Sequence, residues 1–141
     1  MADGETRHAS CVAWADRAVV ILGAAGQGKS GLALQLMALG CTLVADDRVI
    51  LRRDGDMLIA ACPPAIAGLI EARGVGILTA KTQPKAQVVL VVDLNETEAK
   101  RLPDRRWTRI SGLDLPLIAR VDVPHFAAII LQLLRSGWSD A

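Results

Sequence analysis

The stretch AVVILGAAGQGKSGLALQL, residues 18–36, decides which fold this chain of 141 residues can adopt. It begins with an apolar run typical of a buried strand. It ends in a helical pattern, since Leu32, Leu36 and Leu39 repeat at every third or fourth position and Gly40 provides a stop. Between them, residues 23–30 satisfy the pattern G-x-x-x-x-G-K-S. The order of strand, glycine-rich loop and helix predicts a phosphate-binding loop.

The residue types in this glycine-rich loop (residues 23–30) suit a nucleotide. Glycines let the backbone curl so that successive N–H groups face phosphate oxygens, and the helix N-terminus adds a partial positive charge. Lys29 can reach the β- and γ-phosphates, and the Ser30 hydroxyl can bind Mg²⁺. The alternative is an ordinary strand-to-helix turn, which needs no lysine–serine pair. The residues expected to bind ATP are Gly23, Ala24, Ala25, Gly26, Gln27, Gly28, Lys29 and Ser30.

The composition limits the class of protein. Hydrophobic residues make up 52% of the chain and charged residues 22%, as in ordinary globular domains. A net charge of +1 gives no electrostatic reason to expect nucleic acid or a membrane surface as a partner. The sequence shows no signal peptide, and its apolar runs are too short to span a bilayer. We expect Cys11, Cys41 and Cys62 to be reduced thiols in apolar strands of a cytoplasmic protein.

The remaining patterns predict one α/β domain over residues 1–141. Besides the helix at residues 30–39, Pro124 is expected to open a helix that runs through Leu134 and is closed by Gly137. An Asp-Gly pair at residues 54 and 55 predicts a hairpin. The arginines at 101, 105, 106 and 109 form either a solvated face or a contact for an acidic partner. Strands are expected at residues 10–14, 18–22, 42–45, 48–52, 57–61 and 86–94.

Two carboxylates, Asp46 and Asp47, follow the expected strand at residues 42–45. A polar turn between strands is the simpler interpretation, because aspartate favours turns. Beside a nucleotide and Mg²⁺, however, the pair offers one group for the metal and one to accept a proton from an attacking hydroxyl. The second interpretation predicts a phosphotransferase.

Two further segments are weak signals when taken alone. Residues 70–78, IEARGVGIL, would by themselves be interpreted as a glycine-containing loop. His8 alone would be interpreted as a histidine without a functional role. Together with the glycine-rich loop and the segment LVADD, in this order and at these spacings, they resemble the catalytic domain of HPr kinase/phosphorylase. The resemblance covers residues 8–78.

The resemblance implies a fold and a reaction. The fold is a P-loop kinase core of the HPr kinase/PEP carboxykinase-like type, with a mixed central sheet, the P-loop helix and a C-terminal helix. Family members use ATP and Mg²⁺ to phosphorylate a serine of HPr, the phosphocarrier protein of the sugar phosphotransferase system. Many also run the reverse reaction, in which inorganic phosphate attacks phosphoserine and pyrophosphate is released. The family forms homo-oligomers, and this chain would lack the N-terminal domain of its long members.

The resemblance also assigns roles to single residues. Asp47 matches the residue that accepts the serine proton, and His8 a histidine beside the phosphate centre. Ser30 and Glu71 match metal ligands, and Asp46 is expected to support the metal through water. Three residues are expected to be catalytic cations: Lys29 in the glycine-rich loop, Arg73 in the signature segment, and Arg109. The assignment of Arg109 rests on the segment RISGL.

The chain departs from the family pattern at two points. Gly31 follows the loop serine where long members usually carry an acid, and VDVPHFAAII replaces a glycine-arginine-asparagine stretch associated with dephosphorylation. We therefore expect mainly kinase activity, with Arg109 or Arg120 as the residue that could substitute for the missing arginine. Two alternatives stay open: a small-molecule kinase on a similar core, and a nucleotide-binding regulatory module without turnover.

Overall fold

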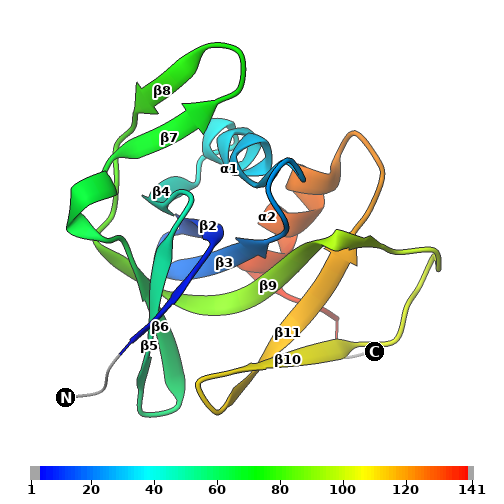
Figure 1. The fold of residues 1–141 in the computed structure, drawn as a ribbon. Coiled ribbons are helices and arrows are strands. Elements are labelled where there is room, and N and C mark those ends of the chain that lie inside the picture. Colours follow the sequence, from blue (N-terminus) through cyan, green and yellow to red (C-terminus); the bar gives the residue numbers. More distant parts are fainter. Residues whose placement is uncertain (1–3, 140–141) are drawn as a thin grey trace.

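A mixed sheet of nine strands runs through the computed structural model, which describes residues 4–139 (Figure 1). The strand order is β1-β5-β6-β9-β3-β2-β4, and β11 pairs with β9 and with β10. The strands of the sheet are β1 (Glu5–Arg7), β2 (Ala9–Trp14), β3 (Arg17–Leu22), β4 (Thr42–Ala45), β5 (Val49–Asp54), β6 (Met57–Ala61), β9 (Lys85–Thr97), β10 (Arg106–Ile110) and β11 (Leu113–Arg120). Outside it lie the helices α1 (Lys29–Ala38) and α2 (Phe126–Ser136), the short 3-10 helix η1 (Pro64–Ile66) and the hairpin of β7 (Leu69–Ala72) and β8 (Gly76–Thr79).

The long strand β9 organises the sheet. It pairs in parallel with β3 and β11, and its first residues pair in antiparallel with β6. Since β2 is antiparallel to both β3 and β4, β4 runs in the same direction as β3. The carboxyl ends of β3, β4, β9 and β11 therefore lie at one edge of the sheet, where ligands bind in open α/β folds.

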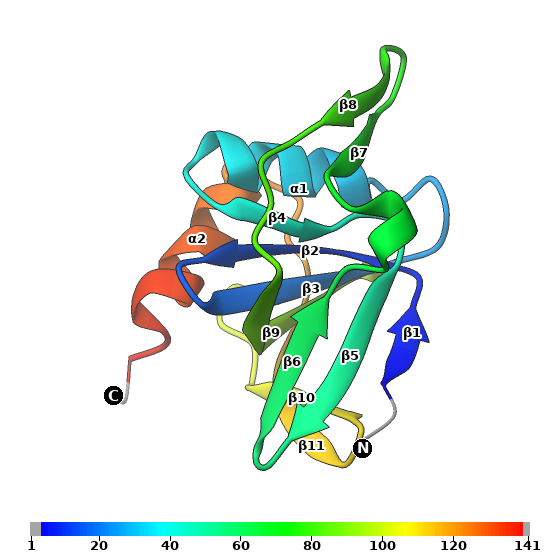
Figure 2. The same ribbon diagram turned by 90° about the vertical axis from the view of Figure 1, so that its left-hand side faces the viewer.

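Side-chain alternation along the strands creates two cores. Val19 and Ile21 of β3 pack with Leu36 of α1 and Ile130 of α2 on the face that the helices cover. Their neighbours, such as Val20, face the opposite core, which the curled ends of the sheet enclose. Figures 1 and 2 show both helices on one side of β2 and β3, while β5, β6, β10 and β11 curl on the other side.

Most predicted elements are present. Helix α1 begins at Lys29, one residue earlier than expected, and α2 begins at Phe126, two residues after Pro124. The Asp-Gly pair joins β5 to β6, with Gly55 at a φ of 64°. The mixed sheet with a loop helix and a C-terminal helix is confirmed. No helix among residues 4–139 is long and apolar enough to cross a membrane.

Other elements differ from the sequence-based expectation. Residues 69–79 are a hairpin rather than a loop, because Gly74, with a φ of 85°, allows a tight turn between β7 and β8. The strands β1, β10 and β11 were not predicted. Only Cys11 lies inside a strand, whereas Cys41 immediately precedes β4 and Cys62 immediately follows β6. All three thiols are free.

Candidate active site

The glycine-rich loop connects the end of β3 to the start of α1 at the carboxyl edge of the sheet. Gly26 and Gly28 have φ angles of 85° and 94°, a region that only glycine occupies without strain. No side chain caps the N-terminus of α1, so backbone N–H groups of its first turn are free of side-chain acceptors. This arrangement can hold an anion, because these N–H groups and the helix dipole both favour negative charge.

Lys29 folds back over the same loop. Its ammonium donates hydrogen bonds to the carbonyl oxygens of Gly23, at 2.7 Å, and Ala24, at 3.3 Å. The side chain is buried, although no carboxylate pairs with it in any described ion pair. A positive charge is therefore kept beside the loop with only neutral oxygens as partners.

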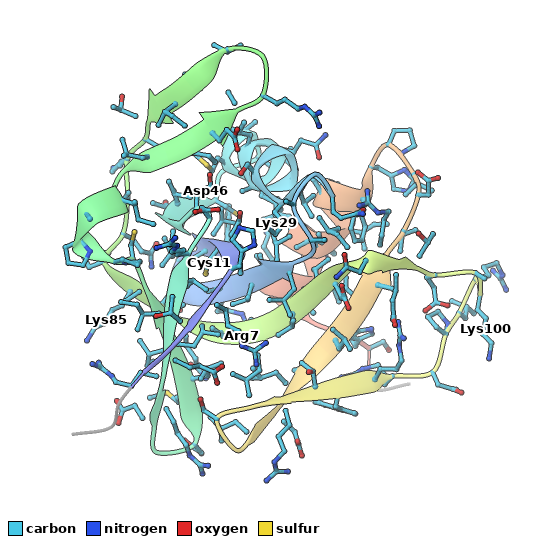
Figure 3. The ribbon with its side chains drawn as sticks, in the orientation of Figure 1. Arg7, Cys11, Lys29, Asp46, Lys85 and Lys100 are labelled. Atoms are coloured by element: carbon cyan, nitrogen blue, oxygen red, sulfur yellow. The ribbon has the colours of Figure 1, made fainter. Side chains whose placement is uncertain are left out.

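Asp46 is the polar centre of the site. Asp46 is only 5% exposed, and its carboxylate accepts hydrogen bonds from three different elements. The Ser10 hydroxyl donates at 2.6 Å, the Ser30 hydroxyl at 2.8 and 3.0 Å to the two carboxylate oxygens, and the Glu71 backbone N–H at 3.0 Å. Figure 3 shows Asp46 and Lys29 at the same edge of the sheet, with Cys11 of β2 just below them. Asp46 thus joins β2, α1 and β7 around the loop.

The pair of Ser30 and Asp46 fits Mg²⁺. A hydroxyl and a carboxylate are hard oxygen donors of the kind this ion prefers, and the two groups already lie within hydrogen-bond distance. Mg²⁺ usually takes only one or two carboxylates from the protein and completes its shell with water and substrate phosphate. Among the described residues, no three histidine, cysteine, aspartate or glutamate side chains form a metal-binding group by themselves.

Asp47 lies in a different environment from its neighbour. Its side chain is 63% exposed, and one carboxylate oxygen is 2.8 Å from Nε2 of the exposed His8. The left-handed backbone of Asp47, with a φ of 70°, turns the chain after β4 and lets consecutive carboxylates point in different directions. The structure thus gives one buried carboxylate and one that an incoming group can reach.

The signature segment meets the site through its backbone. The Glu71 N–H contacts Asp46, while the side chains of Glu71 and of Arg73 in the hairpin turn are exposed. The predicted residues His8, Lys29, Ser30, Asp46 and Asp47 and the Glu71 backbone are therefore brought together at one edge.

The structure does not bring Arg109 to this site. Arg109 lies on β10, where it pairs with Asp114 at 3.3 Å, and Figures 1 and 2 both place β10 at the end of the molecule opposite α1. Arg120, at the end of β11, contacts the loop instead. Its Nη2 donates to the Gln27 carbonyl at 2.6 Å, to the Gln27 side-chain oxygen at 3.3 Å and to the Leu94 carbonyl at 3.2 Å.

Sequence reasoning named Arg120 only as a substitute, although a signal for it was available. Its position at the end of an apolar run, just before Val121 and Pro124, is typical of a residue at the carboxyl end of a parallel strand. Asn95 was missed as well. Its side-chain oxygen accepts the Ala24 N–H at 2.9 Å and fixes the other side of the loop.

Comparisons with known proteins agree on one family. The model of the HPr Serine kinase C-terminal domain matches residues 1–126. HPr kinase/phosphorylase of Cupriavidus necator is 39% identical over 112 residues, which are 71% of this chain and 35% of that protein. HPr kinase/phosphorylase 1 of Oceanobacillus iheyensis is 39% identical over 113 residues, 74% of this chain and 35% of that protein. The chain thus spans about a third of the length of these curated relatives.

A solved structure has a similar fold. The Hpr(Ser) kinase/phosphatase from Coxiella burnetii superposes with a TM-score of 0.79 at 28% sequence identity. The match covers 93% of this chain and 88% of that one. It therefore includes nearly all of this chain.

Proposed function

The chain belongs to the family of HPr serine kinase C-terminal domains, and we propose that it is an ATP- and Mg²⁺-dependent kinase that phosphorylates a serine of the phosphocarrier protein HPr. One observation carries the proposal. The buried carboxylate of Asp46 holds the Ser30 hydroxyl of the glycine-rich loop at 2.8 Å, and the next residue presents an exposed carboxylate beside it. This arrangement joins a place for phosphate and metal to a group that can accept a proton.

Each residue has a task in the proposed reaction. The backbone N–H groups of the loop and of the first turn of α1 bind the phosphates, and Lys29 moves its ammonium from the loop carbonyls to the phosphate oxygens. Ser30 and Asp46 would hold Mg²⁺, which when bound neutralises charge on the phosphates. Glu71, whose backbone touches Asp46, is the further proposed ligand. Arg73, in the turn of the β7–β8 hairpin, is proposed as a catalytic cation.

Asp47 acts as the general base. The serine oxygen forms a bond to the γ-phosphorus, the bond from that phosphorus to the β–γ bridging oxygen breaks, and ADP leaves. The proton of the serine hydroxyl passes to the Asp47 carboxylate, which His8 orients from 2.8 Å. An exposed base suits a serine carried on a folded protein, since the partner must bring its hydroxyl to the surface of the enzyme.

A transfer assay tests the proposal. The protein is incubated with ATP, Mg²⁺ and the cognate HPr, and the phosphate is located by mass spectrometry. We expect one phosphoserine on HPr, and none with Lys29→Ala, which removes the loop charge. Phosphate that appears on a small molecule instead, or ATP that binds without any transfer, would contradict the proposal.

The direction of the reaction has its own test. Phosphorolysis requires phosphate and phosphoserine in one site, and the arginine-bearing stretch of the long family members is replaced here by residues 121–130. We propose that the forward reaction dominates. Serine-phosphorylated HPr is supplied with millimolar phosphate and no ATP, and pyrophosphate is assayed. A rate of pyrophosphate release comparable to the forward rate would refute this part of the proposal.

The proposal extends to the cellular location and the oligomeric state of the enzyme. Three free cysteines fit a reducing compartment, so we propose a cytoplasmic location, where ATP and HPr are available. We also propose that the chain assembles as a homo-oligomer. Light scattering at micromolar concentration checks the assembly, and a strict monomer would contradict it.

A further inference from the structure

A cavity of about 360 Å³ lies between α2, β11 and the segment that joins β9 to β10 (Figure 1). Strand β11 lines it with residues 117–119, and α2 lines it with Ile129 and Leu133. The joining segment, residues 98–105, and Trp138 after α2 form much of the remaining wall. Among the described residues, none of those proposed to hold phosphate or metal or to accept the proton lines this cavity.

The cavity is separate from the candidate active site. Figure 3 shows Lys100, which lines the cavity, at the outer edge of the molecule and well away from Asp46. Ala119 and Val121 line the cavity, whereas Arg120 between them turns to the glycine-rich loop. This division follows from the extended backbone, because successive side chains of a strand point to opposite faces.

The interior of the cavity is apolar. Ile118, Ile129 and Leu133 are branched aliphatic side chains that the protein covers only in part. Trp138 adds an aromatic ring that is 36% exposed. A ligand with a hydrocarbon body would remove this surface from water, and the hydrophobic effect favours that burial.

The rim of the cavity carries positive charge. Lys100 and Arg101 are exposed, and among residues 4–139 neither forms an ion pair. Arg105 places its guanidinium 3.9 Å from the centroid of the Trp138 ring and 5.3 Å from that of Trp107. Since aromatic faces attract a cation without neutralising it, the stacked arginine keeps its charge at the rim.

The carboxylates of the lining leave this charge in excess. Glu98 pairs with Arg106 at 3.5 Å and accepts the backbone N–H groups of Ala99 and Lys100 at 3.1 and 3.2 Å. Its charge is therefore already compensated. Asp104 is the other acidic residue of the lining and stands against the three cations of the rim.

An apolar interior with a positive rim matches an anion that carries a short hydrocarbon body. We infer that this cavity binds a small amphipathic anion, with its body between α2 and β11 and its carboxylate or phosphate head at Lys100, Arg101 and Arg105. The volume falls in the range of about 300–1,000 Å³ that is typical of small-molecule sites. The inference does not depend on the proposed kinase function.

A ligand series on the native chain tests the two halves of the anion. Calorimetry compares octanoate, monooctyl phosphate, octan-1-ol and acetate. We expect saturable binding of octanoate, of monooctyl phosphate or of both, and the tighter of the two identifies the head group. Octan-1-ol should bind about tenfold more weakly because it lacks the charge, and acetate should not bind because it lacks the body.

Two substitutions at the rim test the role of its charge. The double variant Lys100→Gln/Arg101→Gln should bind the tighter anion about tenfold more weakly and octan-1-ol within twofold of the native value. Both side chains are exposed, so the fold should be unaffected. The matched control is Arg52→Gln/Lys85→Gln, which removes two exposed cations outside the cavity and should change neither affinity.

Nuclear magnetic resonance locates the bound anion without a variant. Nuclear Overhauser effects should connect the octyl chain to the methyl groups of Ile118, Ile129 and Leu133. Effects confined to other methyl groups would overturn the inference, as would equal binding of octan-1-ol and the anions. Failure of both anions to bind would also overturn it, and an acidic peptide that bound in their place would make the rim a protein contact.

Discussion

Asp46 and Asp47 are consecutive residues in opposite environments. Asp46 accepts hydrogen bonds from three donors in a buried position, whereas the Asp47 side chain, among residues 4–139, contacts the exposed His8 and, at 4.0 Å, Arg48. A buried and fully bonded carboxylate cannot rotate toward an incoming hydroxyl, which supports the proposal that the exposed Asp47 is the base. The proposed division of tasks between metal support and proton transfer rests on this difference in burial.

Replacing Asp47 by asparagine separates the two tasks. We expect Asp47→Asn to slow phosphate transfer to HPr by roughly 10²–10⁴-fold, the usual size of a general-base effect. The affinity for ATP should stay within about twofold, because the side chain faces solvent rather than the loop. Transfer rates under single-turnover conditions and calorimetry with ATP measure the two quantities.

A matched control for this variant is Asp114→Asn, a similarly exposed aspartate in the β10–β11 hairpin. It should leave both quantities unchanged. An equal loss of ATP binding and transfer in Asp47→Asn would place Asp47 on the metal instead of on the proton.

Arg120 is expected to stabilise the loop. Because its guanidinium holds the Gln27 carbonyl at 2.6 Å, Arg120→Gln should free the loop backbone and weaken tripolyphosphate binding by about tenfold, the effect of losing one charge-assisted hydrogen bond. Calorimetry measures the affinity. Arg109→Gln, which removes an exposed arginine from the far hairpin, serves as the control. If both variants bind tripolyphosphate like the native chain, the contact between Arg120 and the loop has no role in binding.

At the scale of elements, the β7–β8 hairpin is the part of the structure that projects most clearly from the sheet (Figure 2). It reaches the site through the hydrogen bond from the Glu71 N–H to Asp46, and several of its exposed residues are apolar. Val75 is 79% exposed and Ile77 is 64% exposed. Such exposed apolar side chains beside a proposed protein kinase site suit a contact with the protein substrate.

The hairpin can be tested without touching the site. We expect Ile77→Ser to raise the KM for HPr several-fold while the ATP affinity and the rate at saturating HPr stay unchanged, since it removes apolar surface only from the outer strand. Met57→Ser, at an exposed position of the β5–β6 hairpin, is the control. An unchanged KM in Ile77→Ser would move the docking surface elsewhere, for instance to the arginine-rich segment at residues 101–109.

The sequence predicted elements with strong local signals. The glycine-rich loop, both helices and β9 have clear periodicity or an unbroken apolar run, so their identities could be predicted. The hairpin at residues 69–79 could not, because each of its strands has only four residues and Ile70 alone among them is buried. The role of Asp46 needed tertiary structure, since Ser10, Ser30 and Glu71 are far apart in the chain. The contact of Arg120 needed the strand order, which places β11 beside β9.

At the scale of the whole molecule, buried thiols make the free energy of unfolding depend on pH in the alkaline range. Burial raises the pKa of Cys41 to about 11, and it also raises the pKa of Cys11 above the usual range for a thiol. In the unfolded chain these thiols lose their protons near pH 9. The folded state therefore binds more protons between about pH 9 and 11, and the free energy of unfolding must fall as the pH rises through this window.

Urea denaturation at a series of pH values measures this slope. We expect the free energy of unfolding to decrease between pH 8.5 and 10.5, and the decrease to be smaller in Cys41→Ala. Tyrosine does not contribute, because the chain has none. Cys62→Ala, which removes a less buried thiol, should change the slope less. A native slope that neither variant alters would mean that other groups cause the alkaline loss.

The pairing of β9 has a consequence for synthesis on the ribosome. Residues 91–93 of β9 have β3 on one side and β11 on the other, and β11 ends only at Arg120. Until β11 has left the exit tunnel, the nascent chain exposes an apolar strand edge, VLVVD at residues 89–93, of the kind that pairs with other chains. The core that the helices cover is also incomplete until α2 follows. This domain therefore cannot complete its sheet until β11 has emerged, and chaperones that shield strand edges should bind it longest while residues 95–120 are being added.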